Sequence, residues 1–230
     1  AGVPDAAFVA LTGDDRKWVT ALKKRNKAER EQSAQGELFD TGGLTVDTRA
    51  LAGRVRDLEQ GASASLDDVH RIEQRYRDLE HDPAYANARL VADAWCAAFV
   101  CPKAPDAPVI THGVIEQLQA DPSAEVAVRE AVHRIAVAYR FFHWYLEFPQ
   151  VLGGEDPGFT CMVGNPPWEI LQMSEQEFFA SRDETIANAA NAAARKRMIA
   201  ELAGTRPELF AEFQATSRRG SPGASSAAAP

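Results

Sequence analysis

Residues 158–172 read GFTCMVGNPPWEILQ, and this stretch is the most informative part of the chain for the fold. The run 159–163 is rich in residues that favour strands, and it leads into the sequence NPPW at 165–168. Prolines lack a backbone N–H and force the preceding residue towards extended conformations. We therefore expect a short buried strand over 159–163 that ends in a rigid corner.

The corner combines hydrogen-bond acceptors with an aromatic plate. The side chain of Asn165 offers one acceptor and two donors. Pro166 and Pro167 contribute carbonyls without competing N–H groups, and Trp168 offers a flat face for stacking. Ligands of open α/β sheets bind beyond the carboxyl ends of strands. A planar base with an exocyclic amino group suits this corner, because the amino group donates two hydrogen bonds while the ring stacks.

The rest of the chain predicts helices. Apolar residues recur at helical spacing, and prolines or glycines separate the segments. The segment 82–100 is apolar on most sides in its second half and is expected at the centre of a core. The expected helices cover residues 14–33, 46–58, 65–79, 82–100, 113–120, 121–143 and 182–203, with a last piece ending near 213.

Local signals mark where several of these helices begin. Ser65 can cap the helix that follows it, and Ser174 stands three residues before a glutamate in a capping-box pattern. Asp82 and Asp121 are each followed by a proline, which is favoured in the first turn of a helix.

Composition describes an ordinary globular chain. It has 230 residues with 45% hydrophobic and 25% charged residues, enough for one or two domains. A net charge of −8 argues against a generally basic protein that coats nucleic acid, although a local basic groove stays open. The longest apolar run is too short to span a bilayer, and the first residues do not resemble a secretory signal. We expect no membrane partner.

The cysteines do not form a recognisable framework. Cys96, Cys101 and Cys161 are odd in number and lack C-x-x-C spacing, and the histidines are scattered. We expect three reduced thiols in a cytoplasmic protein and no metal site.

The order of the signals predicts a mainly α fold. One strand cannot make a sheet, so either weak strands lie near 145–152 or the missing strands lie outside this chain. We expect a helical spacer region over 1–120, a partial α/β element over 121–215, and a disordered tail over 216–230, which is low in complexity.

The corner also supports a resemblance to a known family. Residues 165–168 look like motif IV, a signature of Asp, Asn or Ser followed by two prolines and an aromatic residue, of the amino-methyltransferases that modify DNA adenine at N6. The wider run 141–169, FFHWYLEFPQVLGGEDPGFTCMVGNPPWE, resembles the large Eco57I-type restriction–modification methylases. The resemblance covers about residues 8–210 and implies a Rossmann-like fold that uses S-adenosylmethionine.

The resemblance implies a role for each residue of the corner. The partner would be double-stranded DNA with the target adenine flipped out of the helix. The side-chain oxygen of Asn165 and the carbonyl of Pro166 would accept the two N6 hydrogens, with Pro167 completing the corner. Trp168 would stack on the base.

The chain also departs from the family. We find no glycine-rich F-x-G-x-G motif for the cofactor, so the cofactor-binding residues are unknown. The expectation is therefore a fragment of a larger adenine-specific methylase or methylase–nuclease polypeptide, inactive alone. The alternative is a non-catalytic helical module that binds a protein partner or DNA. An independent nuclease is disfavoured, because no fitting cluster of carboxylates and lysine is present.

Two further features have less distinctive interpretations. His143 stands at the end of an expected helix, where a structural role is more common than a catalytic one. The basic run 17–30 could contact phosphates, but its interleaved acids favour a solvated helix face.

Overall fold

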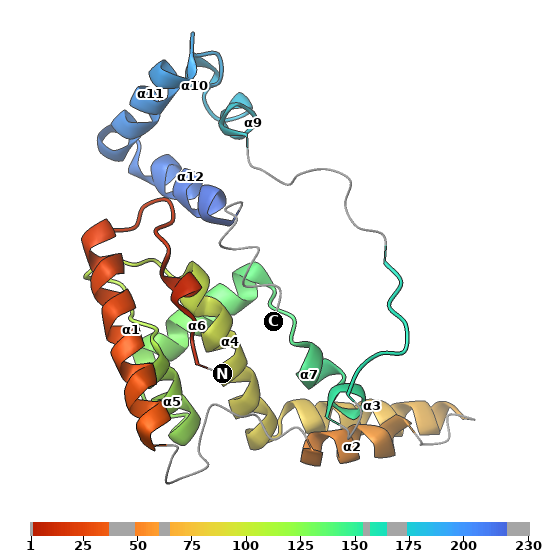
Figure 1. Ribbon diagram of the computed structural model, residues 1–230. Coiled ribbons are helices and arrows are strands. Elements are labelled where there is room, and N and C mark those ends of the chain that lie inside the picture. Colours follow the sequence, from red (N-terminus) through yellow and green to blue (C-terminus); the bar gives the residue numbers. More distant parts are fainter. Residues whose placement is uncertain (1, 37–48, 60–64, 154–156, 165–173, 220–230) are drawn as a thin grey trace.

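The computed structural model describes residues 2–36, 49–59, 65–153, 157–164 and 174–219. Every regular element in these ranges is helical, which confirms the mainly α prediction (Figure 1). No helix in these ranges is long and apolar enough to cross a membrane. In chain order the elements are η1 (Asp5–Phe8, a 3-10 helix), α1 (Arg16–Gly36), α2 (Arg49–Glu59), α3 (Leu66–Glu80), α4 (Pro83–Val100), α5 (His112–Ala120), α6 (Val126–Tyr139), α7 (Trp144–Glu147), α8 (Pro149–Leu152), α9 (Glu175–Ala180), α10 (Glu184–Ala187), α11 (Ala192–Thr205) and α12 (Pro207–Arg219).

Helix α4 is the centre of the main core, as its sequence predicts. Its apolar residues contact η1, α5 and α6, while α1 closes the far side against η1 and α5 (Figure 1). Ala94 and Ala97 on α4 are fully buried, and these small side chains let the neighbouring helices approach closely. The core therefore joins segments from both ends of the first 140 residues.

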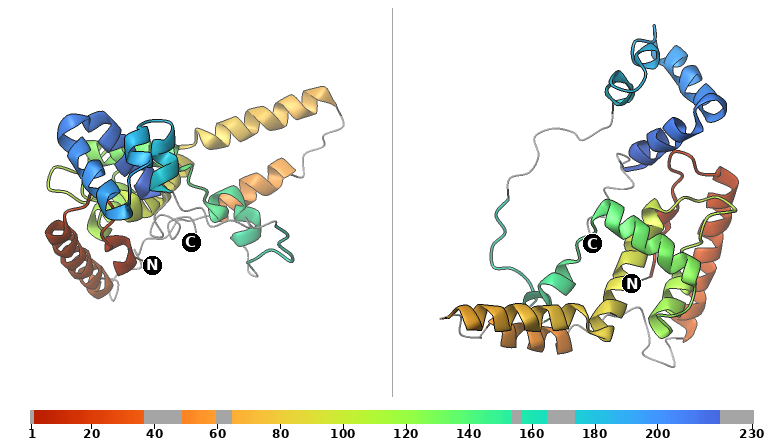
Figure 2. Two further views of the ribbon diagram at one scale, coloured as in Figure 1. Left: turned by 90° about the horizontal axis from the view of Figure 1, so that it is seen from above. Right: turned by 180° about the vertical axis from the view of Figure 1, so that it is seen from behind.

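A second group of helices lies beside the lower end of α4. Leu51 of α2, Leu79 of α3 and Leu146 of α7 pack there with Tyr85 and Ala92 of α4. Helix α3 projects away from the helical body (Figure 2, left), and Leu79 is its one buried residue among those described.

The C-terminal helices form a cluster of their own. Helices α9 to α12 pack consecutively around Phe178, Phe179 and Phe213. These rings lie 4.9 to 5.5 Å apart between centroids, in tilted and edge-on arrangements. The unit lies above the main core and meets it through the end of α12 (Figure 1).

The structure largely confirms the helix N-termini that the local signals predict. Ser65 forms a full capping box with Asp68, and Asp82 caps α4 with Pro83 in its first turn. Ser174 accepts a hydrogen bond from the backbone of Glu177 at the start of α9. Asp121 instead holds the loop before α6 together, because it accepts hydrogen bonds from Ser123, and α6 begins only at Val126.

Several expected boundaries are wrong. The helix expected over 182–203 is broken into α10 and α11, and Asn191 caps the second part. The segment 145–152, one of the two alternatives for the missing strands, lies in the helical turns α7 and α8. Helix α6, which follows the expected division at 120, packs in the main core, and α12 continues past 215 to Arg219. Residues 220–230 of the expected tail lie outside the described ranges.

Candidate functional site

The corner itself lies outside the described residues, and the structure describes the segment that leads to it. Asn165, Pro166, Pro167 and Trp168 all fall in the range 165–173, whose placement is not described. The approach runs from α7 and α8 through residues 157–164.

An aromatic cluster anchors this approach; it consists of Phe142, Trp144, Phe148 and Phe159. The rings of Trp144 and Phe148 stack with centroids 5.8 Å apart, since one helical turn separates them. Phe159 packs edge-on against both rings, at 5.8 and 5.4 Å. The N–H of Gly158 also donates to the carbonyl of Val151 at 3.2 Å. Phe159, six residues before Asn165, is thus held against α7 and α8.

Beyond Phe159 the expected buried strand is wrong. Residues 159–164 are irregular and exposed, with Met162 68% and Val163 95% exposed. Cys161 is exposed too, so neither it nor Met162 is the core residue that a buried strand requires. The physical reason is the lack of a partner, because a strand needs a neighbour for its backbone groups and the described ranges contain none.

His143 lies behind the aromatic cluster and ties α7 to α4. Its Nε2 lies 2.7 Å from Oδ1 of Asp93, and both side chains are mostly buried. Burial raises the pKa of the Cys96 thiol to about 12, and the Asp93 carboxylate adds to this. Burial likewise raises the pKa of Tyr145 to about 12, with Cys96 and Asp93 contributing. A thiol and a phenol held in their protonated forms are poor nucleophiles, so this group has the character of a structural joint.

A pocket opens on the other side of Asp93, between α4 and α6. Its volume is ≈ 320 Å³, and its polar lining side chains are Arg89, Asp93, His133 and Arg140. The arginines lie near the surface, while Asp93 is engaged by His143.

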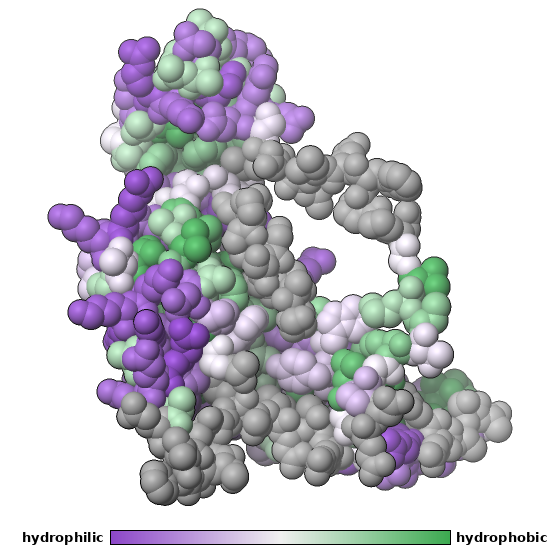
Figure 3. Space-filling view, viewed as in Figure 1, coloured by the Kyte–Doolittle hydropathy of each residue, from purple (hydrophilic) through white to green (hydrophobic). Residues whose placement is uncertain are grey.

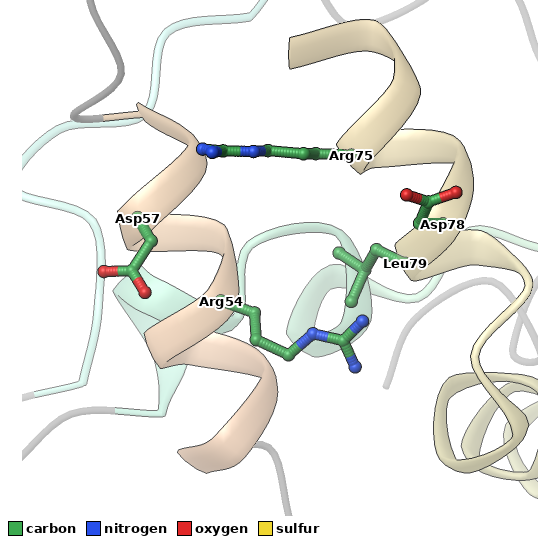
Figure 4. Close-up of a pocket in the computed structure, with 5 residues that line it drawn as sticks. All are labelled: Arg54, Asp57, Arg75, Asp78 and Leu79. Carbon is green, nitrogen blue, oxygen red and sulfur yellow. The ribbon is translucent and has the colours of Figure 1, made fainter. Parts of the chain in front are cut away.

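A larger pocket of ≈ 400 Å³ lies between α2 and α3 (Figure 4). Arg75 extends from α3 towards α2, and Asp57 and Arg54 line the opposite side (Figure 4). Asp78 completes a set of two arginines and two aspartates, and Arg54 already forms an ion pair with Asp82 at 2.5 Å. The balanced charges give this pocket no net preference for an anion or a cation.

A buried charged joint, which the sequence did not reveal, links the two ends of the chain. Nη2 of Arg218 on α12 donates to Oδ1 of Asp14 at 2.6 Å and to the carbonyl of Thr12 at 2.8 Å. The backbone N–H of Lys103 donates to the same Asp14 oxygen at 2.9 Å. Burial alone raises the pKa of Asp14, but the hydrogen bonds from Arg218, Lys103 and Leu11 outweigh it and leave the pKa below its usual value.

S-adenosylmethionine has no assigned site in the described residues. In Rossmann-like folds the cofactor lies at the carboxyl ends of strands, and the described ranges contain no strand. The apolar pocket of ≈ 300 Å³ beside α12 is lined in part by Arg218, which is paired with Asp14, and by Arg219. The described residues also contain no cluster of three or more histidine, cysteine, aspartate or glutamate side chains that could hold a metal ion.

Comparisons with protein-family models, with curated proteins and with solved structures give no significant match. The resemblance to adenine-N6 methylases therefore stays a prediction from residues 141–169.

Proposed function

We propose that this chain supplies the helical region and the adenine-binding corner of a site-specific DNA methyltransferase that modifies adenine at N6. The system would be a restriction–modification or phage-defence system of the cytoplasm, where free cysteines such as the three here stay reduced. The proposal rests on the sequence NPPW at 165–168 together with its lead-in.

One structural observation carries the proposal furthest: the run 159–163 is anchored at one end and exposed beyond it. Its residues favour strands, yet Met162 and Val163 lie in solvent. An exposed apolar run of strand-favouring residues is expected for a strand that lacks its neighbouring strands. We infer that strands outside the described residues complete a Rossmann-like element around it and bring the corner to a strand end.

The corner would then bind the amino group of a flipped adenine. Asn165 and the carbonyl of Pro166 would accept its two hydrogens, and such hydrogen bonds contribute about 0.5–1.5 kcal/mol each. Trp168 would stack on the base, a contact worth about 1–3 kcal/mol. S-adenosylmethionine would be bound by a segment outside the described residues, because the cofactor lies at strand ends in Rossmann-like folds and the described ranges contain no strand.

The test is a binding comparison that does not depend on the methyl donor. We would measure the affinity for a duplex with one adenine opposite an abasic site and compare it with the affinity for the same duplex in which thymine replaces that adenine. The abasic site lowers the cost of flipping the base. We expect the adenine duplex to bind more tightly. Asn165→Ala should lower the ratio of the two affinities about tenfold. Asn165→Asp keeps the acceptor oxygen and should retain the preference for adenine.

Two controls make the comparison specific. Asn188→Ala removes the same side chain at an exposed position near α10 and should leave both affinities unchanged. Trp168→Ala should weaken both duplexes, since stacking does not distinguish the bases. Equal affinities of the wild type for adenine and thymine would contradict the proposal.

A second candidate is a non-catalytic helical module that binds a partner. It is favoured by the helical packing itself, because the described ranges form apolar clusters without any strand. The two candidates differ in methyl transfer. Radioactive methyl transfer to DNA, assayed with a methylase segment that carries the F-x-G-x-G motif added, should appear with the wild type and not with Asn165→Ala under the first candidate. It should never appear under the second.

A further inference from the structure

Helix α1 carries a concentration of positive charge that contrasts with the rest of the protein. Residues 16–28 contain six basic side chains and no acidic one, whereas the whole chain has a net charge of −8. The basic residues are Arg16, Lys17, Lys23, Lys24, Arg25 and Lys27. All six are exposed.

Five of these side chains share one face of the helix. Arg16, Lys23 and Lys27 follow one another at intervals of seven and four residues, which places them in one row. Lys17 and Lys24 are also seven apart and form the adjacent row. Hydrophilic side chains accordingly gather along α1, at the left of the space-filling view (Figure 3).

The opposite face of α1 is occupied by the main core. Val19, Leu22 and Asn26 are buried there, and Trp18 is packed against the same core. The orientation of the helix is therefore fixed, and its basic rows must face outwards.

Acidic neighbours compensate only part of this charge. Arg25, outside the five-residue face, pairs with Glu29 at 2.6 Å. Lys23 lies 4.0 Å from Asp5 and Lys27 lies 3.8 Å from Glu31, and exposed ion pairs as long as these contribute little. Arg16, Lys17 and Lys24 form no ion pair with any residue in the described ranges.

The position of Arg16 and Lys17 is unfavourable for the helix itself. They occupy the first turn of α1, which has no acidic residue of its own; the carboxylate of Asp15, just before the helix, accepts hydrogen bonds from the backbone N–H groups of Lys17 and Trp18. The helix dipole favours acidic side chains at this end, so basic ones there do not serve helix stability. A role in binding an anion explains their presence better than a role in folding.

We propose that the exposed basic face of α1 binds the phosphate backbone of duplex DNA. The proposal rests on the proposed function for the identity of the polyanion, and it adds the surface along which the duplex lies. Rows of lysine and arginine on a rigid helix suit a regular array of phosphates, which binds without regard to sequence.

An anionic membrane is the competing partner for a basic helix, and the packing argues against it. Amphipathic helices that lie on membranes insert their apolar face between the lipids. The apolar face of α1 is covered by the core, so only electrostatic attraction would remain.

The test measures binding of a fluorescent duplex of mixed sequence as a function of salt. We expect the wild type to bind at about 50 mM salt and to lose affinity steeply as salt rises. The triple variant Arg16→Gln, Lys17→Gln, Lys24→Gln should bind at least tenfold more weakly. Its slope of log affinity against log salt should be smaller by up to about 0.9 for each lost phosphate contact.

The matched control removes three charges from α3, where acidic residues alternate with the basic ones. The variant Arg71→Gln, Arg75→Gln, Arg77→Gln should bind DNA within about twofold of the wild type. Circular dichroism should show that both triple variants keep their helix content. Equal weakening by the two triple variants would overturn the proposal, since only total charge would then matter.

Two further arms separate the alternatives. Binding of the wild type to vesicles of anionic phosphatidylserine, but not to DNA, would overturn the proposal in favour of a membrane. Asn165→Ala should bind the mixed-sequence duplex like the wild type, because α1 contacts only the backbone. If the adenine preference is absent while α1 still binds DNA, the adenine corner fails and the backbone surface stands.

Discussion

Asn26 shows how a single polar residue can hold three parts of the chain together. It is fully buried on α1, and its Nδ2 donates to the carbonyl of Val3 at 2.9 Å. Its Oδ1 accepts from the backbone N–H of His112, the first residue of α5, at 2.9 Å. One amide thus satisfies an orphan donor at a helix start and a carbonyl of the N-terminal segment.

Replacing Asn26 by leucine should be strongly destabilising. The leucine has a similar size but leaves the carbonyl of Val3 and the N–H of His112 buried without partners, at about 1–3 kcal/mol each. We expect the free energy of unfolding in urea to fall by about 2–6 kcal/mol. Lys24→Leu, at an exposed position two residues earlier on α1, should change it by less than about 0.5 kcal/mol. Equal effects of the two substitutions would contradict the role of the amide.

At the scale of single residues, the sequence predicts hydrogen bonds between neighbouring residues and does not predict those between residues distant in the chain. The caps at Ser65, Asp82 and Ser174 were predictable, because each capping side chain and the backbone N–H groups that donate to it lie within three residues. The partner of Asn26 lies 86 residues away, and that of Arg218 lies 204 residues away. No spacing rule connects such positions before the fold is known.

Helix α3 depends on its cap more than the other long helices do. It projects from the body and buries only Leu79 among its described residues, so tertiary packing supports little of its length. Its first turn is held by Ser65, whose hydroxyl accepts from the N–H of Asp68 while the Asp68 carboxylate accepts from the N–H of Ser65.

Ser65→Ala should therefore loosen α3 locally. The loss of a serine cap costs about 1 kcal/mol, which corresponds to roughly fivefold faster amide hydrogen exchange in the first turns of α3. Exchange in α4 should not change. Ser123→Ala, which removes a hydroxyl bonded to Asp121 in a remote loop, provides the control and should leave α3 unchanged. Uniform acceleration across the chain would instead indicate global destabilisation.

At the scale of elements, periodicity identified most helices and failed for the strand. The apolar pattern of α4 is fixed by its own residues, and its place in the core followed from it. The run 159–163 has strand-favouring residues, but a strand forms only where a neighbour offers its backbone, and the described ranges offer none. Strand formation is thus a property of the partner as much as of the run.

The whole molecule is joined by the contact between the end of α12 and the beginning of the chain. Arg218 donates to the carbonyl of Thr12 and to the carboxylate of Asp14, and its other terminal nitrogen lies 3.5 Å from the carbonyl of Val100 at the end of α4. The Asp14 side chain is fully buried, and that of Arg218 is 10% exposed. The sequence placed this arginine in a low-complexity tail, because tail composition surrounds it and its partner is distant.

The joint should depend on pH through Asp14. Its pKa is lowered below the ordinary 3.8 by hydrogen bonds that outweigh the opposing effect of burial. A lowered pKa means that the ionised joint stabilises the fold at every pH above 3.8, and that this contribution is lost as pH falls through the lowered value.

Arg218→Met leaves the Asp14 carboxylate buried without its cation, which costs about 3–5 kcal/mol. We expect this loss in urea unfolding at pH 7 and a clearly smaller loss near pH 3. Arg219→Met, at the exposed neighbouring position, should have little effect at either pH. A loss of equal size at both pH values would mean that Arg218 acts through its packing and not through the charge of Asp14.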